Sequence, residues 1–147
     1  LRLFDPKYQN HSDNEAMSLV SKVLRVPEGD ITNIRCLKAG MTNKSFLFEL
    51  HGDHYICRIP GPGTERLINR KEEEAVYQAV NPLHMTEDII YFDGETGYKI
   101  ARYYEGARNA DPHSEEDMKL FMQEIKRLHK SGLTVAYLFP AGTDRFL

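Results

Sequence analysis

Residues 40–45, Gly-Met-Thr-Asn-Lys-Ser, place amide, ammonium and hydroxyl groups shortly after a glycine and between two apolar segments. Because glycine lacks a Cβ atom, its backbone can adopt a positive φ or approach a ligand closely. The stretch can therefore cover the phosphates of a nucleotide. It can equally be an ordinary hairpin turn, because glycine and asparagine favour turns for steric reasons alone. From these residues alone, the hairpin turn is the simpler interpretation.

Arg58 is a candidate phosphate-binding cation. It stands in the middle of the largely apolar segment 55–60, Tyr-Ile-Cys-Arg-Ile-Pro, where an unpaired charge would be costly to bury. Alternation along a strand places Ile56 on the same face of the sheet as Arg58. A guanidinium stays charged when buried and can donate two hydrogen bonds to one phosphate. The alternative, an arginine at a sheet edge that points into water, fits the spacing equally well.

A carboxylate partner for Arg58 would come from residues 69–77, Asn-Arg-Lys-Glu-Glu-Glu-Ala-Val-Tyr. Glu73 and Glu74 both lie where a carboxylate could reach Arg58, and Glu72 is close by. A glycine turn over the phosphates, a cation that holds them and an acid that holds the cation are parts that phosphoryl transfer requires. Taken singly, each glutamate is also explained as part of a solvated helix face.

These groups need elements that hold them in place, and the residue patterns predict an α+β fold. Ser12 with Glu15, and Ser114 with Asp117, have the spacing of a capping box at a helix start. The sheet is expected to be antiparallel, with about five strands and one helix inserted after the third. The predicted elements are helices over 11–24, 65–80 and 118–129 and strands over 31–38, 45–50, 54–60, 89–92 and 98–104.

Composition excludes several classes of protein. The chain has 147 residues with 19 Lys and Arg against 22 Asp and Glu, and a net charge of −3 argues against a general nucleic-acid binder. No apolar run approaches the roughly 20 residues that span a bilayer, so no membrane partner is expected. Charged residues interrupt the start, so it does not read as a signal peptide. Two cysteines suit a reducing compartment, and we expect a cytoplasmic protein.

Four segments resemble the choline/ethanolamine kinase family, particularly its bacterial choline kinase branch. The most specific match is Arg-Ile-Pro-Gly-x-Gly-Thr-Glu-x-Leu-Ile-Asn-Arg-x-x-Glu over 58–73. The resemblance runs from about residue 31 to residue 132 and implies the two-lobed fold that this family shares with aminoglycoside phosphotransferases and protein kinases. The order of the predicted elements is also that of a kinase amino-terminal lobe. The matching segments are GMTNKSFLFEL, YICRIPGPGTERLINRKEEEAVY, YKIARYYEGA and IKRLHKSG.

The resemblance implies a nucleotide site with ATP and Mg²⁺ as cofactors. Arg58 would take the role that lysine plays in most kinases, and Glu73 would be its partner on the helix. The strand between the lobes would hydrogen-bond adenine through its backbone. The implied site residues are Gly40, Met41, Thr42, Asn43, Lys44 and Ser45 over the phosphates, Ile56 beside adenine, Arg58, Glu73, and Arg102 and Tyr104 against adenine.

The resemblance also implies a truncated kinase. Residues 1–30 would be an amino-terminal extension with its helix, 31–104 the nucleotide-binding lobe, 105–117 a hinge, and 118–147 the start of the carboxyl-terminal lobe. The catalytic loop, a His-x-Asp with Asn five residues after the Asp, and the Mg²⁺-binding Asp would follow Leu147. His11-Ser12-Asp13 does not fit, because Ser18 stands where the Asn should be. We therefore expect no catalytic residue, no metal ligand and no turnover from this chain alone.

The predicted function is the nucleotide-binding part of an ATP-dependent choline kinase-like phosphotransferase that acts on choline or ethanolamine. One alternative is another small-molecule kinase of this fold, acting on an aminoglycoside or a sugar alcohol. A second is a binding module that holds a nucleotide or a protein without chemistry. The opening residues 1–8 resemble the junction in bacterial proteins that carry a cytidylyltransferase upstream. A last helix cut from its lobe would expose its apolar stripe, 118–128, or bury it in an oligomer.

Overall fold

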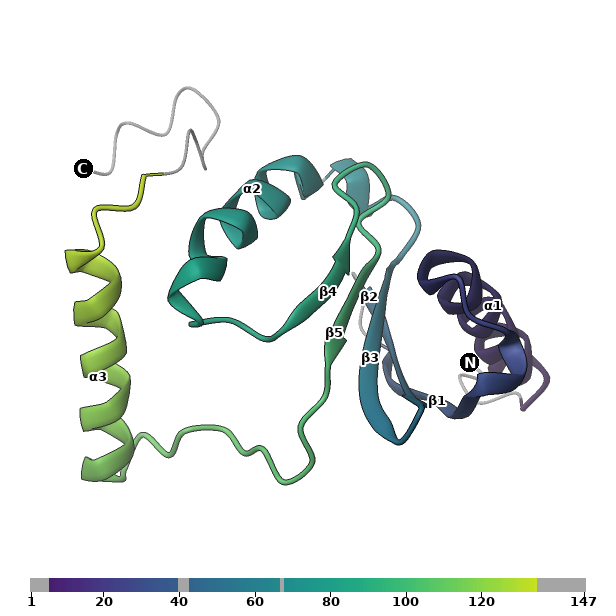
Figure 1. Ribbon diagram of the computed structural model, residues 1–147, viewed down its shortest axis with the longest axis horizontal. Coiled ribbons are helices and arrows are strands. Elements are labelled where there is room, and N and C mark those ends of the chain that lie inside the picture. Colours follow the sequence, from purple (N-terminus) through teal and green to yellow (C-terminus); the bar gives the residue numbers. More distant parts are fainter. Residues whose placement is uncertain (1–5, 40–42, 67, 135–147) are drawn as a thin grey trace.

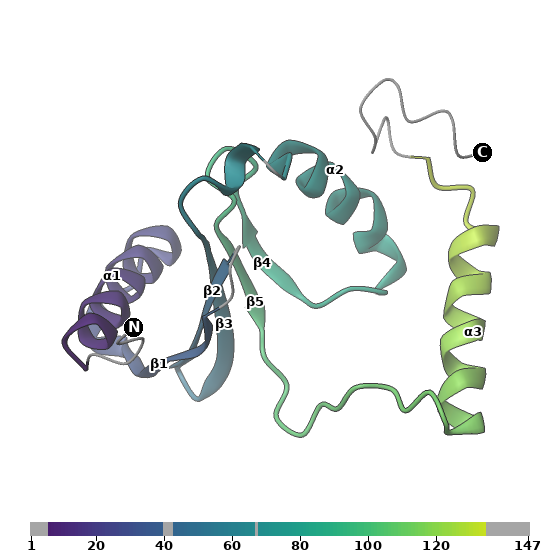
Figure 2. The ribbon, with the colours of Figure 1, turned by 180° about the vertical axis from the view of Figure 1, so that it is seen from behind.

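In the described part of the chain, a five-stranded antiparallel sheet is accompanied by two flanking helices and one separate helix (Figures 1 and 2). The computed structural model describes residues 6–39, 43–66 and 68–134. Short 3₁₀ turns at Glu28–Asp30, Thr64–Arg66 and Asn81–Leu83 link some of the elements. The elements are α1 (Pro6–Leu24), β1 (Ile31–Ala39), β2 (Asn43–Leu50), β3 (Asp53–Pro60), α2 (Arg70–Val80), β4 (Ile89–Phe92), β5 (Lys99–Arg102) and α3 (Glu115–Lys130).

The strands lie in the order β1-β2-β3-β5-β4, and each neighbouring pair is antiparallel. Helix α2 follows β3 and leads to β4 at the edge, and β5 then returns between β3 and β4. The predicted α+β fold, with five strands and a helix after the third, is confirmed. In both views α1 and α2 lie on opposite sides of the sheet (Figures 1 and 2). The two faces of the sheet therefore have different surroundings.

The main core lies between α1 and one face of the sheet. Ala16 and Val20 of α1 are fully buried against alternate residues of the central strands. Alternate strand residues are buried here because side chains in a strand point to the two faces in turn, so only every second residue faces α1. The sheet residues in this core include Phe46, Phe48, Leu50, Cys57 and Ile100. The residues between them face the other side, toward α2, and include Arg58.

All three predicted helix starts differ from the structure, although the predicted cap of the last helix is correct. Helix α1 begins at Pro6, so Ser12 is not its N-cap. Helix α2 begins at Arg70, later than predicted, because Asn69 caps it and accepts hydrogen bonds from two backbone N–H groups of the first turn, at 3.2 and 3.3 Å. In α3 the Ser114 side chain accepts a hydrogen bond from the N–H of Asp117, as the capping spacing predicted.

Several strand bounds also differ from the predictions, and two of the differences concern predicted site residues. Strand β2 starts at Asn43 rather than Ser45, because Asn43 pairs with Pro60 in the β3 register. Strand β5 ends at Arg102, so Tyr104 lies beyond the sheet. Asn43 and Tyr104 are both among the site residues predicted from the sequence.

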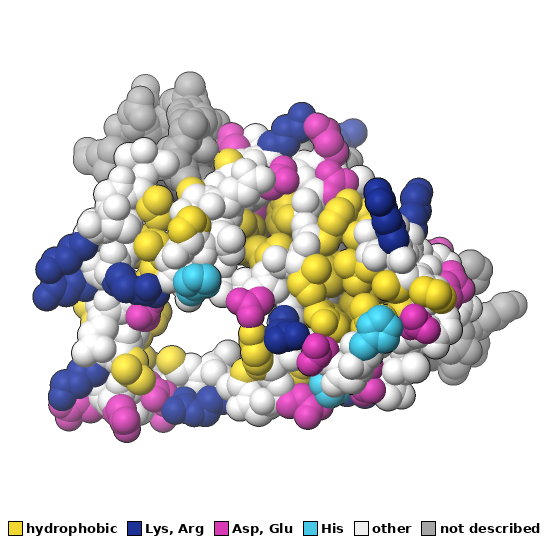
Figure 3. Space-filling view, in the orientation of Figure 1, with side chains coloured by type: hydrophobic (Ala, Val, Ile, Leu, Met, Phe, Trp, Pro, Cys, Tyr) yellow, Lys and Arg dark blue, Asp and Glu magenta, His cyan; other side chains and the backbone are white. Residues whose placement is uncertain are grey.

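Helix α3 lies apart from the sheet and carries exposed apolar side chains. A linker joins it to β5, and Arg108 in this linker donates a hydrogen bond of 2.9 Å to Asp117 in the first turn of α3. Figure 3 shows an open gap bordered by α3, the linker and the rest of the molecule. Phe121 is 52% exposed, and Leu120 and Met122 are exposed as well. This exposure agrees with the expectation for the stripe over 118–128.

Over residues 6–39, 43–66 and 68–134, every helix is too short or too polar to cross a membrane.

Candidate functional site

Arg58 lies inside the molecule, on the sheet face toward α2. It pairs with Ser45 on β2 and with Lys99 on β5, so all three residues form one row across the sheet. Only 14% of its side chain is exposed. The interpretation of Arg58 as an arginine that points into water is therefore wrong. A buried guanidinium requires a partner, because the cost of desolvating an unpaired charge is large.

Glu73 is that partner. Nη1 of Arg58 donates a hydrogen bond of 2.6 Å to Oε1 of Glu73, which lies in the first turn of α2. Nη2 of Arg58 reaches the carbonyl oxygen of Gly97 at 3.4 Å, and the guanidinium lies 5.5 Å from the centre of the Phe92 ring. Glu72 and Glu74 make no ion pair with Arg58. The ion pair implied by the resemblance is present.

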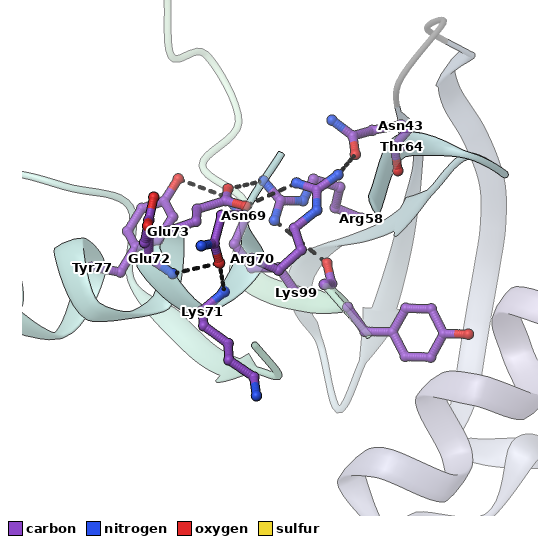
Figure 4. A network of polar contacts seen from close by, with 12 residues as sticks. Asn43, Arg58, Thr64, Asn69, Arg70, Lys71, Glu72, Glu73, Tyr77 and Lys99 are labelled. Atoms are coloured by element: carbon purple, nitrogen blue, oxygen red, sulfur yellow. Dashed lines mark hydrogen bonds and ion pairs between the residues drawn. The ribbon is translucent and has the colours of Figure 1, made fainter. Parts of the chain in front are cut away.

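A second arginine, Arg70, shares the same carboxylate, although the sequence analysis named it only as part of a motif. Nη1 of Arg70 donates a hydrogen bond of 2.8 Å to Oε2 of Glu73, and Nη2 donates one of 3.1 Å to Oδ1 of Asn43. Figure 4 shows the contacts of both guanidiniums converging on Glu73, with Asn43 at the far end of Arg70. Only 7% of the Arg70 side chain is exposed. Its position could have singled out Arg70, because the helix dipole disfavours a cation in the first turn of a helix such as α2.

The cluster of Arg58, Arg70 and Glu73 has an excess of positive charge. Burial alone would raise the pKa of the Glu73 carboxyl, but hydrogen bonds from Arg58 and Arg70 outweigh it and bring the pKa below its usual value. The carboxylate is therefore ionised at neutral pH and balances one of the two guanidiniums. Within the described residues, Nε of Arg58 and Nε of Arg70 are buried without a hydrogen-bond partner. Such a cluster can accept an anion, since phosphate oxygens match the donors of arginine.

Lys99, the neighbour of Arg58 on β5, is also buried but has its own counter-charge. Its ammonium forms an ion pair with Glu87 and donates a hydrogen bond of 3.2 Å to the Tyr77 hydroxyl. It also lies 4.8 Å from the centre of the Tyr77 ring. The sequence analysis did not identify Lys99, because its burial depends on β5 lying next to β3. The excess charge therefore remains with the two arginines.

An apolar row lies beside the charged row on the same face. Ile56 pairs with Leu47 on β2 and with Ala101 on β5, and Ala101 pairs with Ile89 on β4. Ile56 is partly exposed, and it lies on the face predicted for it. A flat apolar surface next to cations is the combination that a planar base with attached phosphates needs.

The predicted phosphate stretch is described only in part. Gly40, Met41 and Thr42 lie outside the described residues. Asn43 and Ser45 share the face of Arg58, and Asn43 contacts Arg70. Lys44 is exposed and pairs with Ile59, whose side chain packs against the α1 core, so Lys44 belongs to the opposite face. The roles of these residues toward phosphate stay predictions.

The backbone at the end of β5 is already partly used within the protein. The N–H of Arg102 donates a hydrogen bond of 2.9 Å to the carbonyl of Asp88, and the carbonyl of Tyr104 accepts one of 3.3 Å from Ala107. The Arg102 side chain forms an ion pair of 2.8 Å with Asp53 on the surface. The N–H group of Arg102 is therefore already occupied within the protein. The predicted contacts of Arg102 and Tyr104 with adenine remain predictions.

The described residues do not build a complete metal site by themselves. In ranges 6–39, 43–66 and 68–134 there is no group of three or more His, Cys, Asp or Glu side chains that could hold a metal. We therefore derive no step through Mg²⁺ from the residues of this chain.

Comparison with known proteins places the fold. No family model and no curated protein matches the sequence. Among solved structures, choline kinase LicA from Streptococcus pneumoniae matches with a TM-score of 0.66 and 25% identity over 88% of this chain and 44% of LicA. A structure of LicA in complex with AMP matches with a TM-score of 0.60 and 24% identity over 88% of this chain and 45% of that one. A choline/ethanolamine kinase family protein from Mesorhizobium loti matches with a TM-score of 0.60 and 25% identity, over 86% and 41% of the two chains.

This chain thus spans less than half of the length of each of these proteins. Most of this chain takes part in each match. The resemblance that the motifs indicated is confirmed: the chain is structurally similar to choline/ethanolamine kinases and has their kinase-like fold.

Proposed function

We propose that this chain is the nucleotide-binding part of an ATP-dependent choline kinase-like phosphotransferase. The observation that carries the proposal is the buried cluster in which Arg58 and Arg70 share the single carboxylate of Glu73. Its excess positive charge lies beside an apolar strip of sheet, so it suits a base with attached phosphates. The structural neighbours support the same conclusion, since LicA is a choline kinase with a structure in complex with AMP.

In this proposal the residues of the chain bind and orient the nucleotide. Arg58 donates hydrogen bonds to phosphate oxygens, and Glu73 holds the guanidinium in place from α2. Ile56 lies against the adenine ring, and the carbonyl of Arg102 and the backbone of Tyr104 bind its edge. Gly40 to Ser45 cover the phosphates. Positioning and charge stabilisation of this kind make up most of what a protein contributes to phosphoryl transfer.

The transfer itself would need groups outside this chain. The hydroxyl oxygen of choline or ethanolamine attacks the γ-phosphorus, the bond from that phosphorus to the β,γ-bridging oxygen breaks, and ADP leaves. A carboxylate accepts the hydroxyl proton, and Mg²⁺ offsets the phosphate charge when bound. We assign the carboxylate and the Mg²⁺ ligands to the remaining lobe of the whole enzyme. This chain alone would therefore bind nucleotide without turnover.

Replacing Arg58 with alanine tests the nucleotide site. We expect the dissociation constant for ATP to rise about 10- to 100-fold, because charge-assisted hydrogen bonds to phosphate are lost. Adenosine lacks phosphates, so its affinity should change less than about threefold. Calorimetric titration of the folded variant with both ligands measures the two effects. Arg127→Ala is the control, because it removes the same charge from an exposed position on α3, away from the sheet.

The proposal fails if the folded wild-type chain binds no ATP. It also fails if Arg58→Ala weakens ATP and adenosine equally.

The acceptor is tested on the whole protein, including whatever its gene encodes after Leu147. We expect phosphate transfer from ATP to choline or ethanolamine, and no transfer to an aminoglycoside such as kanamycin. Phosphorylated product is measured by mass spectrometry. Transfer to the aminoglycoside alone would contradict the choline kinase assignment but not the nucleotide site. ATP binding without transfer to any acceptor would favour a non-catalytic module.

A further inference from the structure

We propose that Arg70 is a positioning residue, which occupies the second oxygen of Glu73 and so keeps one edge of the Arg58 guanidinium available for phosphate. The inference rests on the proposed nucleotide site and deepens it. It gives a role to a residue that the sequence analysis treated only as part of a motif.

The two oxygens of Glu73 are divided between two arginines. Oε1 accepts from Arg58 at 2.6 Å and Oε2 accepts from Arg70 at 2.8 Å. A single arginine beside a carboxylate commonly forms two parallel hydrogen bonds to both oxygens. Here Arg58 binds Glu73 through Nη1 alone. Its Nη2 makes only the 3.4 Å contact with the Gly97 carbonyl, which is long for a hydrogen bond, and its Nε has no partner among the described residues.

Arg70 is held firmly enough to act in this way. Besides Glu73, it binds Oδ1 of Asn43 at 3.1 Å, at the start of β2. Gly97 packs directly against it, since a Cβ atom at Gly97 would lie 2.9 Å from both Cδ and Nε of Arg70. The side chain is thus fixed by α2, β2 and the turn before β5. It has little freedom to leave Glu73.

Stability alone does not account for an arginine at this position. The helix dipole disfavours a cation in the first turn of α2, and burial of a charge is costly. The Nε group is buried without a partner within the described part of the chain. An apolar side chain of similar length would avoid all three costs. The positive charge of Arg70 is explained if Arg70 prevents Glu73 from forming a second hydrogen bond with Arg58.

Removing Arg70 would change Arg58 in two ways. Oε2 of Glu73 would become free to accept a second hydrogen bond from Arg58. The two side chains would then form a closed pair, in which two parallel hydrogen bonds join one guanidinium to one carboxylate. The cluster would also lose its excess positive charge, since one guanidinium would then face one carboxylate. Both changes weaken binding of phosphate and leave the adenine surface as it is.

The test compares ATP and adenosine binding in Arg70→Met, which keeps an unbranched side chain without charge. We expect the dissociation constant for ATP to rise at least about tenfold and that for adenosine to change by less than about twofold. Arg66→Met, an exposed arginine in the preceding turn, is the control and should bind both ligands normally.

A second mutation separates this role from a merely structural one. In Arg70→Met with Glu73→Gln, the glutamine cannot form the closed pair, and the cluster regains a positive charge. ATP affinity should therefore recover at least about threefold relative to Arg70→Met alone. A structural role predicts a further loss in the double variant, and that result would overturn the inference.

Two outcomes separate the inference from the proposed function. If Arg58→Ala weakens ATP binding but Arg70→Met does not, this inference is wrong and the nucleotide site stands. If neither variant affects ATP binding, both are wrong. Should Arg70→Met fail to fold, Arg70→Lys keeps a charge that can reach Glu73. It should bind ATP within about threefold of wild type, and an equal loss of ATP and adenosine affinity would count against the role.

Discussion

Glu73→Ala is expected to destabilise the protein by about 3–5 kcal/mol, because it leaves two buried guanidiniums without their shared carboxylate. Arg58 and Arg70 are only 14% and 7% exposed, so water cannot readily replace Glu73. Domains of this size are typically stable by about 5–15 kcal/mol, so the loss is a large part of the total. Urea denaturation followed by circular dichroism measures the free energy of unfolding.

Glu72→Ala is the matched control, since Glu72 is the neighbouring acid on the same turn. No ion pair joins its side chain to another described residue, and we expect a change within about 1 kcal/mol. An equal effect of the two mutations would show that the cluster does not stabilise the fold.

Lowering the pH should reduce the contribution of Glu73 to the stability of the fold over a defined pH range. The two arginines hold the pKa of its carboxyl below the ordinary value despite burial, which acts in the opposite direction. The stabilisation is therefore complete above the unfolded-state pKa of about 4.3 and is lost as the pH falls through the lower folded-state value. The difference in stability between wild type and Glu73→Gln should narrow over this range.

Gly97→Ala is expected to cost about 2–5 kcal/mol. Gly97 has φ +74°, where a Cβ atom is strained by about 1–2 kcal/mol, and that atom would lie 2.8 Å from Cγ of Pro60 and 2.9 Å from Cδ of Arg70. Crowding of this kind in a packed region adds about 1–3 kcal/mol. The same denaturation measurement reports the loss.

Gly52→Ala separates the two costs. Gly52 has φ +86°, but a Cβ atom there would meet nothing within 4 Å. It should therefore show the backbone cost alone, about 1–2 kcal/mol. If both alanine variants lose the same stability, close packing of Gly97 against Arg70 does not contribute.

The sequence predicted what depends on local pattern. Alternation correctly placed Ile56 and Arg58 on one face, and turn residues marked the strands well enough for the fold class. The start of α2 was predicted too early, because the apolar residues before Asn69 resemble a helix face while the cap at Asn69 decides where the helix begins. The residue pattern within one segment does not show which residue will cap the helix and so determine where it begins.

The parts that could not be predicted depend on segments that meet only in the folded chain. Lys99 is buried because β5 returns beside β3, and Gly97 touches Arg70 for the same reason. Arg70 looks like an ordinary polar helix residue until Asn43 and Glu73 are both in place. Residue spacing contains no information on these long-range contacts, so the sequence analysis missed Arg70 as the second guanidinium at the site.

The position of β5 has a mechanical consequence. Because β5 has β3 on one side and β4 on the other, the segment that leads to α3 leaves from a strand anchored along both edges. A force applied through α3 would have to shear two ladders at once and could not peel a single strand from the rim. Tension along the linker would then act on the strand that carries Lys99, directly beside Arg58.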